Sequence, residues 1–152
     1  MSQEDPYKIF VTHTFQEHEE YAQVFEYLEA RDNFFYQNFS DPEVRLEGGG
    51  EEALQELIRQ QIRPVEIVLF PAGIYGQNPR LIDFQLKVAQ AFKKPIVTIK
   101  SFGGTQVLPR ETEEVATDTI EWNDRVITDA IRRIGRGEDT AMWDVIEFDP
   151  DC

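Results

Sequence analysis

The chain lacks the features that would place it in a membrane, a disulfide scaffold or a thiolate metal site. Its single cysteine is Cys152, the last residue, so the sequence excludes an internal disulfide and a cysteine metal cluster. No apolar run approaches the roughly 18 residues that a membrane span needs. The acidic segment Met1–Pro6 lacks the basic and apolar regions of a signal peptide. We therefore expect a cytoplasmic protein with no membrane partner.

Basic residues are scarce as well. Lysine and arginine number 15 against 29 aspartates and glutamates, which gives a net charge of −14 and argues against nucleic acid as a partner. The stretch from Glu138 to Cys152 contains six acidic residues and no lysine or arginine. We interpret residues 1–137 as one domain and residues 138–152 as an acidic tail. Trp143 and Phe148 in that tail indicate packing on the domain or contact with a partner.

Apolar segments typical of strands alternate with amphipathic helical segments along the chain. The expected strands are Tyr7–His13, Asn33–Gln37, Glu66–Phe70, Ile96–Lys100 and Ala116–Trp122. The expected helices are Glu17–Ala30, Glu51–Ile62, Asn78–Lys93 and a last one after the capping residue Asn123, to about Ile134. This alternation predicts an α/β fold, with a five-stranded parallel sheet and helices on both faces.

Polar and aromatic residues gather at the predicted carboxyl ends of the strands, where parallel sheets bind ligands. Rings and hydroxyl groups suit the base and ribose of a nucleotide, and Arg45 suits a phosphate. Each residue alone also has an ordinary role, as core, loop anchor or solvated charge. The candidate substrate-binding residues are His13, Thr14, Phe15, Tyr36, Asn38, Ser40, Arg45, Ala72 and Tyr75.

Gln85 interrupts the apolar stripe of the helix predicted after the third strand. It lies three or four positions from its apolar neighbours Leu81, Ile82, Val88 and Ala89. A buried amide without partners costs about 1–3 kcal/mol, so it needs hydrogen bonds. Two interpretations are open at this point: the amide bonds to a nearby backbone group, or it faces a ligand pocket.

The common catalytic and cofactor motifs are absent from the sequence. There is no Gly-x-Gly-x-x-Gly after a strand, no phosphate loop ending in Gly-Lys-Ser or Gly-Lys-Thr, and no Gly-x-Ser-x-Gly elbow. His13 and His18 have no third ligand nearby, so we expect no metal site. The third strand ends in Leu69-Phe70-Pro71 and not in aspartate, which argues against a phosphoacceptor receiver domain.

Several segments, taken in order, form a pattern that covers roughly residues 7–134. They are Lys8-Ile-Phe-Val-Thr-His-Thr-Phe, Phe35-Tyr-Gln-Asn-Phe-Ser-Asp-Pro, Leu54 to Pro64, Val68 to Tyr75, Leu81-Ile-Asp-Phe-Gln-Leu, Lys94-Pro-Ile-Val and Thr119-Ile-Glu-Trp-Asn. Together these segments resemble TIR-like domains, and more narrowly the bacterial and archaeal group that includes ThsB proteins of Thoeris anti-phage systems.

This resemblance implies a single flavodoxin-like TIR domain and an enzyme that cleaves NAD+ at the nicotinamide–ribose bond. The released ADP-ribose unit would be cyclised or conjugated into a signalling nucleotide. It further implies NAD+ as substrate with no separate cofactor, a homo-oligomer, and a separate effector protein reached through the diffusible nucleotide. Members of the family use a glutamate on the helix after the third strand, where a carboxylate stabilises the positive charge that develops on the ribose.

In this chain, Gln85 stands at the position of that glutamate. One explanation is a catalytically weakened Glu-to-Gln form made to trap a substrate or product, which the isosteric exchange favours. Another is a natural, nonenzymatic TIR-like module that binds a nucleotide or builds an assembly. A third is a nucleoside-processing enzyme of similar topology. The sequence leaves all three open.

Overall fold

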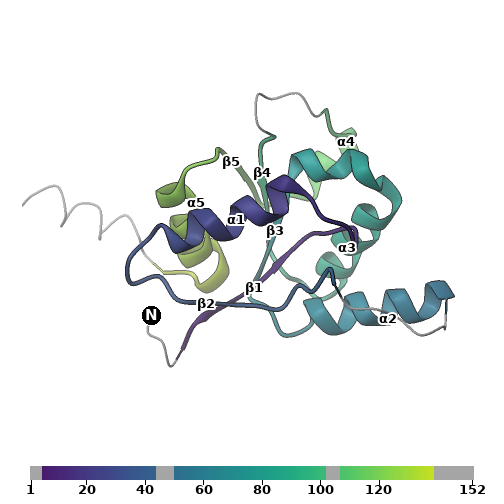
Figure 1. Ribbon diagram of the computed structural model, residues 1–152, viewed down its shortest axis with the longest axis horizontal. Coiled ribbons are helices and arrows are strands. Elements are labelled where there is room, and N and C mark those ends of the chain that lie inside the picture. Colours follow the sequence, from purple (N-terminus) through teal and green to yellow (C-terminus); the bar gives the residue numbers. More distant parts are fainter. Residues whose placement is uncertain (1–4, 44–49, 102–106, 139–152) are drawn as a thin grey trace, which may run out of the picture.

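Five parallel strands form one sheet, with helices on both faces (Figure 1), as the alternation predicted. The structure is a computed structural model and describes residues 5–43, 50–101 and 107–138. The strand order is β2-β1-β3-β4-β5, which is compatible with a flavodoxin-like domain. The strands are β1 (Tyr7–Val11), β2 (Tyr36–Asn38), β3 (Ile67–Pro71), β4 (Ile96–Ile99) and β5 (Asp118–Ile120).

The four expected helices connect the strands in the order that the sequence indicated, and the structure adds a short helix after β3 and another after β4. The helices are α1 (Glu19–Glu29), α2 (Gly50–Ile62), the 3-10 helix η1 (Ala72–Gln77), α3 (Pro79–Ala91), α4 (Arg110–Glu114), α5 (Asp124–Ala130) and the π-helix η3 (Ile131–Gly135). The chain order reverses between β1 and β3, so the carboxyl ends of these two strands flank the position where such sheets bind ligands.

Apolar side chains fill two layers, one on each face of the sheet. Alternate residues of a strand point to opposite faces: Ile9 and Val11 of β1 pack with α1 and α5, whereas Phe10 packs with α2 and α3. Strands β1 and β3 are covered on both sides, which explains the continuous apolar run Ile67–Pro71. Burial on both faces therefore fixes the position of the strand ends.

Polar side chains cap the starts of α1, α3 and α5. Asn78 accepts a hydrogen bond from the Leu81 N–H at 3.2 Å and begins α3, and Asn123 caps α5 as predicted. His18 caps α1 through Nδ1, which accepts from the Glu20 N–H at 3.1 Å. The helix expected from Glu17 consequently begins at Glu19.

Several expectations about local structure need correction. Strand β1 ends at Val11 and not at His13, and β5 covers only Asp118–Ile120 of the expected Ala116–Trp122. The second strand begins at Tyr36 and not at Asn33, because Asn33 adopts a left-handed conformation with φ of 62° that ends the preceding turn.

The spacing of Leu54, Leu57, Ile58 and Ile62 predicts an apolar stripe on α2, but Leu54 and Leu57 are only half-buried, whereas Ile58 and Ile62 are buried. The amino-terminal half of α2 therefore has an incompletely covered apolar side.

The boundary between the domain and the acidic tail falls at the edge of the described residues. Glu138 accepts a hydrogen bond from the Tyr7 hydroxyl at 2.7 Å, which joins the end of η3 to the start of β1. Trp143 and Phe148 lie outside the described residues, so their predicted packing stays a prediction. Among the helices in the described parts of the chain, none combines the length and the apolar character needed to cross a membrane.

Candidate functional site

Gln85 is fully buried at the carboxyl end of β1, with both of its polar groups hydrogen-bonded to one residue. Its Oε1 accepts from the His13 main-chain N–H at 3.1 Å, and its Nε2 donates to the His13 carbonyl oxygen at 2.6 Å. The amide thus pairs with the peptide groups that β1 would otherwise leave unsatisfied beyond its last residue. Of the two open interpretations, the contacts match the one in which Gln85 bonds to the backbone.

Gln61 of α2 makes the same kind of paired contact with the loop after β2. Its Oε1 accepts from the Asp41 N–H at 3.1 Å, and its Nε2 donates to the Asp41 carbonyl oxygen at 3.4 Å. The His13 side chain joins the two amides, because its Nε2 lies 3.0 Å from Gln61 Oε1. Two glutamines and one histidine therefore hold the loops after β1 and β2 against α2 and α3.

The contacts of His13 define which nitrogen carries its proton. Nδ1 accepts from the Phe15 N–H at 3.3 Å, so the proton lies on Nε2, which donates to Gln61. Burial lowers the pKa of His13 from 6.5 to about 4, and the bond to Gln61 and the charge of Asp41 oppose this only in part. At neutral pH, His13 is an uncharged structural group in this position.

Tyr21 on α1 joins the same cluster through the loop after β2. Its hydroxyl lies 2.9 Å from Ser40 Oγ, and the Asn38 side-chain amide donates to it at 3.4 Å. Asn38 Oδ1 also accepts from both the N–H and the hydroxyl of Ser40. The predicted residues Asn38 and Ser40 therefore come together, and they hold the ring of Tyr21 near His13, with ring centroids 6.3 Å apart.

The loop after β3 is held by contacts from the loop after β1. Thr14 Oγ1 hydrogen-bonds Gln77 Oε1, and Gln77 Nε2 donates to the Glu17 carbonyl oxygen at 3.2 Å. The predicted residue Thr14 is therefore buried beside η1. Ala72, the first residue of η1, is also buried at the end of β3.

A buried carboxylate lies at this same edge of the sheet. Glu20 is 7% exposed, and its Oε1 accepts from the Gly73 N–H at 3.1 Å. A Cβ atom at position 73 would overlap the carboxyl group of Glu20, so glycine is required for this approach. Sequence reasoning did not identify Glu20, which looked like one of several acids at the start of a helix.

We expect Gly73→Ala to destabilise the fold by about 1–2 kcal/mol, because the added methyl group displaces Glu20 and breaks its bond to the main chain. Glu20→Ala loses the same bond, so the double variant should be no less stable than Glu20→Ala alone. Denaturant unfolding measures all three. Gly135→Ala is the control, because the Cβ atom that it adds would lie at an ordinary 3.5 Å from Ile67. If the double variant instead lost the sum of the two single losses in unfolding free energy, the contact between Glu20 and Gly73 would be contradicted.

Beside these contacts lies a hollow of about 720 Å³, formed by the loop after β1, the start of α1 and the loop after β2. Phe15 contributes its half-buried ring, which packs edge-on against His13 with centroids 4.6 Å apart. The volume falls within the roughly 300–1,000 Å³ of typical ligand pockets. The lining residues are Phe15, Gln16, Glu17, His18, Glu19, Tyr21, Ala22, Pro42 and Glu43.

Two predicted site residues, Tyr36 and Tyr75, do not join this cluster. Tyr36 pairs with Tyr7 at the amino end of the sheet, and its hydroxyl donates to Glu29 at 3.3 Å. Tyr75 turns toward α3, where its hydroxyl donates to Asp83 at 3.1 Å beside a separate pocket of about 440 Å³. Arg45 lies outside the described residues, so its suggested contact with a phosphate stays a prediction.

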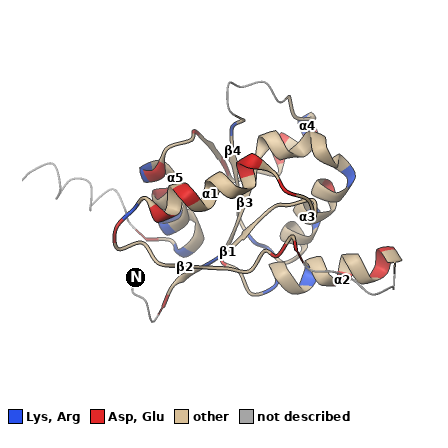
Figure 2. Ribbon diagram, viewed as in Figure 1, with Lys and Arg blue, Asp and Glu red and all other residues tan. Residues whose placement is uncertain are grey.

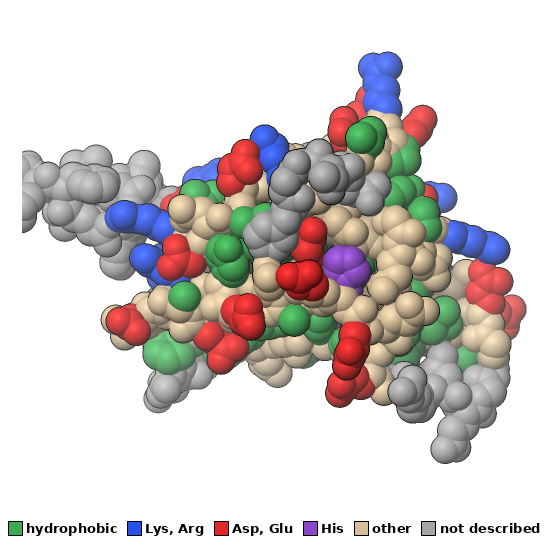
Figure 3. Space-filling model, turned by 45° about the horizontal axis from the view of Figure 1, so that its top comes forward, with side chains coloured by type: hydrophobic (Ala, Val, Ile, Leu, Met, Phe, Trp, Pro, Cys, Tyr) green, Lys and Arg blue, Asp and Glu red, His purple; other side chains and the backbone are tan. Residues whose placement is uncertain are grey.

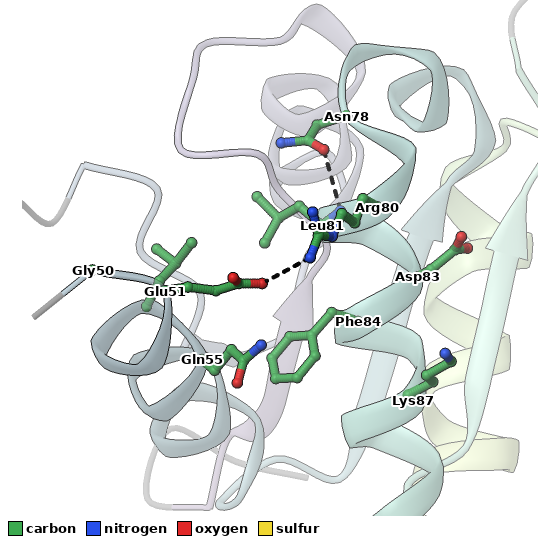
Figure 4. A pocket seen from close by; sticks show the side chains of 10 residues that line it. Gly50, Glu51, Gln55, Asn78, Arg80, Leu81, Asp83, Phe84 and Lys87 are labelled. Carbon is green, nitrogen blue, oxygen red and sulfur yellow. Dashed lines mark hydrogen bonds and ion pairs between the residues drawn. The ribbon is translucent and has the colours of Figure 1, made fainter.

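A second hollow of about 720 Å³ lies between α2 and α3 (Figure 4). Phe84 points toward α2 across this groove, and Arg80 of α3 reaches Glu51 of α2 at 3.2 Å. The groove follows from the incompletely covered side of α2, where Leu54 is half-buried. The lining residues that the structure describes include none of the candidate site residues from the sequence.

Gln61 is the main site residue that sequence reasoning missed, although the sequence contains a signal for it. It follows Leu57 by four positions and Ile58 by three, so it interrupts an apolar stripe in the way that Gln85 does. The spacing of Tyr21, Val24, Phe25 and Leu28 predicts one apolar face of α1, but it gives no signal for the partners of the Tyr21 hydroxyl.

No protein-family model matches the chain, and none of the curated proteins matches it.

Proposed function

We propose that the chain is a TIR-like domain that binds NAD+ or its ADP-ribose part without breaking the nicotinamide–ribose bond. The observation that supports this most is Gln85, which stands at the position of the family glutamate. Its side chain is uncharged, fully buried and bonded at both ends to the main chain of His13. An amide in this position supplies no negative charge for a developing ribosyl cation.

The fold supports binding at the carboxyl edge of the sheet. The strand order reverses between β1 and β3, and ligands of such sheets bind outside the strand ends next to this reversal. The hollow that Phe15 and Tyr21 line is at this edge and has the volume of a small-molecule site. The paired contacts of Gln61 and Gln85 hold its surrounding loops in place before a ligand arrives.

Calorimetry with NAD+ and with ADP-ribose, combined with a chromatographic assay for nicotinamide, tests this proposal. We expect saturable binding of NAD+ and no nicotinamide above the level in buffer after prolonged incubation. Absence of binding by both compounds would refute nucleotide recognition. Steady release of nicotinamide by the unaltered chain would refute the nonenzymatic role.

A second candidate is the NAD+-cleaving anti-phage enzyme itself, weakened by glutamine at position 85. The ordered resemblance over residues 7–134 and the isosteric relation of glutamine to glutamate favour it. It entails a homo-oligomer and an ADP-ribose-derived signal, cyclic or conjugated, that activates a separate effector. Under this candidate, Gln85→Glu would release nicotinamide and sizing would show self-association; under the nonenzymatic proposal, the same variant releases none.

A further inference from the structure

An open aromatic pocket of about 440 Å³ lies beside the amino ends of β1 and β2. The ring of Phe34 stacks on Tyr7 with centroids 5.1 Å apart, and its centroid lies 6.5 Å from that of Tyr36. The pocket is at the opposite end of the sheet from Gln85, so it is separate from the candidate nucleotide site. Its lining residues are Pro6, Phe34, Phe35, Tyr36 and Gln37, which suit an apolar side chain as the occupant.

The last described residue before the acidic tail lies next to this aromatic pocket. Glu138 accepts from the Tyr7 hydroxyl at 2.7 Å, and its N–H donates to the Arg132 carbonyl oxygen at 3.1 Å. Tyr7 in turn stacks on Phe34, which lines the pocket. Trp143 follows Glu138 by five residues, and five extended residues span at most about 18 Å. The indole of Trp143 is therefore within reach of the pocket.

The surroundings of the aromatic pocket are basic, whereas the tail is acidic. Figure 2 shows basic residues on the last helical segment and on the turn after α1. Residues 124–136 include Arg125, Arg132, Arg133 and Arg136. The guanidinium group of Arg132 lies 5.4 Å from the centroid of the Phe34 ring, and no described carboxylate forms an ion pair with it. Figure 3 shows a different face, where acidic side chains gather beside a histidine and would repel the tail.

Arg31 gives a second, independent indication of a missing acidic partner. It lies in the turn between α1 and β2, three residues before Phe34. Its Nε is buried and has no hydrogen-bond partner among the described residues. A buried donor without an acceptor costs about 1–3 kcal/mol, so a carboxylate brought to this turn would be stabilising.

We propose that the aromatic pocket is the docking site for the acidic tail of the same chain, with Trp143 in the pocket and tail carboxylates at Arg132 and Arg31. The tail combines the apolar side chains that the pocket suits with six acidic residues and no basic one. A short tether gives such a segment an effective concentration of about millimolar, so weak contacts suffice. The inference goes beyond the proposed function and does not depend on it, because nucleotide binding is assigned to the other end of the sheet.

Acrylamide quenching of Trp143 fluorescence tests this proposal in the full chain. The background variant Trp122→Phe leaves Trp143 as the single tryptophan. A docked indole is shielded from the quencher, so we expect quenching at least about threefold weaker than that of free tryptophan, and equally weak after about tenfold dilution of the protein. Quenching as strong as that of free tryptophan overturns the docking. Shielding that is lost on dilution would mean that a second copy is involved, and it overturns docking within one chain.

A pair of matched variants in the same background locates the docking site. Phe35 is half-buried, lines the aromatic pocket and belongs to neither apolar layer of the core, so Phe35→Ser alters the pocket without opening the core. We expect it to increase the quenching of Trp143 at least about twofold. Phe84→Ser is the control, because Phe84 faces the groove between α2 and α3 and should not affect Trp143. The reverse result, with release by Phe84→Ser alone, would place the tail in that groove and overturn the proposal.

A second pair of variants tests the electrostatic part of the docking. Arg132→Gln should increase the quenching of Trp143 and should weaken its dependence on salt, because the charge that attracts the tail is removed. Arg110→Gln on α4 also removes one positive charge, but from an exposed pair with Glu114, and should change neither quantity. Far-UV circular dichroism confirms that each variant is folded. Equal effects of the two arginine variants would show that only the net charge matters and would overturn a specific site at Arg132.

Discussion

Gln85→Glu is expected to destabilise the protein by about 3–5 kcal/mol at pH 8, the cost of a buried charge without a partner. One oxygen of the introduced carboxylate can still accept from the His13 N–H, but the other would lie where Nε2 now donates to the His13 carbonyl oxygen at 2.6 Å. Two acceptors would then face each other in a site without solvent exposure. Urea unfolding of the variant and of the unaltered chain measures the difference.

The pH dependence distinguishes this electrostatic effect from loss of hydrogen bonds. Burial raises the pKa of the introduced carboxyl group, so its protonated form can again donate to the carbonyl oxygen. The stability deficit should be small near pH 5 and should grow as pH rises toward 8. Gln85→Met, which removes both hydrogen bonds without adding a charge, is the control and should give a nearly constant deficit. A Gln85→Glu variant as stable as the unaltered chain at pH 8 would mean that position 85 reaches solvent or a cavity.

His13 is expected to titrate near pH 4 in the folded protein, well below the ordinary pKa of 6.5, because its ring is buried. The unfolded chain therefore binds this proton at a higher pH than the folded chain does. The contribution of His13 to the free energy of unfolding is fully present above about pH 6.5. It decreases as the pH falls toward 4, by about 3 kcal/mol in total. An NMR titration of the imidazole resonances measures the pKa of His13 directly.

His18→Asn simplifies this measurement, because it leaves His13 as the single histidine and keeps a capping oxygen at the start of α1. Acid unfolding of the same variant measures the accompanying loss of stability. A His13 resonance that shifts with a midpoint near pH 6.5 would show that the ring is hydrated. In that case, the hydrogen bond between His13 and Gln61 would not hold the two loops together.

The fold was predictable from the sequence because local chemistry and global architecture agree. The run Ile67–Pro71 is apolar at every position, as expected for a strand covered on both faces. Asn78 and Asn123 begin helices where their side chains cap the main chain. Alternation of such segments restricts the arrangement to a parallel sheet, because each crossover must pass over a face of the sheet.

The site was less predictable, because its contacts join residues far apart in the sequence. Helical periodicity placed Gln85 on the buried side of its helix, but it could not show that His13, 72 residues earlier, supplies both partners. Helical periodicity likewise places Gln61 on the buried side of its helix, but it does not indicate that Asp41 is its hydrogen-bond partner. A polar residue in an apolar stripe thus signals a specific contact and leaves the partner open.

Strand boundaries explain why Tyr36 was placed at the wrong end of the sheet. The sequence predicted a strand over Asn33–Gln37, which would put Tyr36 near its carboxyl end. The left-handed turn at Asn33 delays the strand, so Tyr36 becomes its first residue and pairs with Tyr7. A shift of three residues moves a side chain by about 10 Å along a strand, enough to separate it from the ligand-binding edge.

Hydrogen exchange of the Gln85 side-chain amide, followed by NMR with and without NAD+, tests most directly whether position 85 is structural. Because the amide is buried and bonded to His13, its protons should exchange at least about 100-fold more slowly than those of the exposed Gln60. Its resonances should also stay in place when NAD+ is added. Exchange as fast as that of Gln60, or a large shift of the Gln85 resonances on addition of NAD+, would show instead that this side chain faces the ligand.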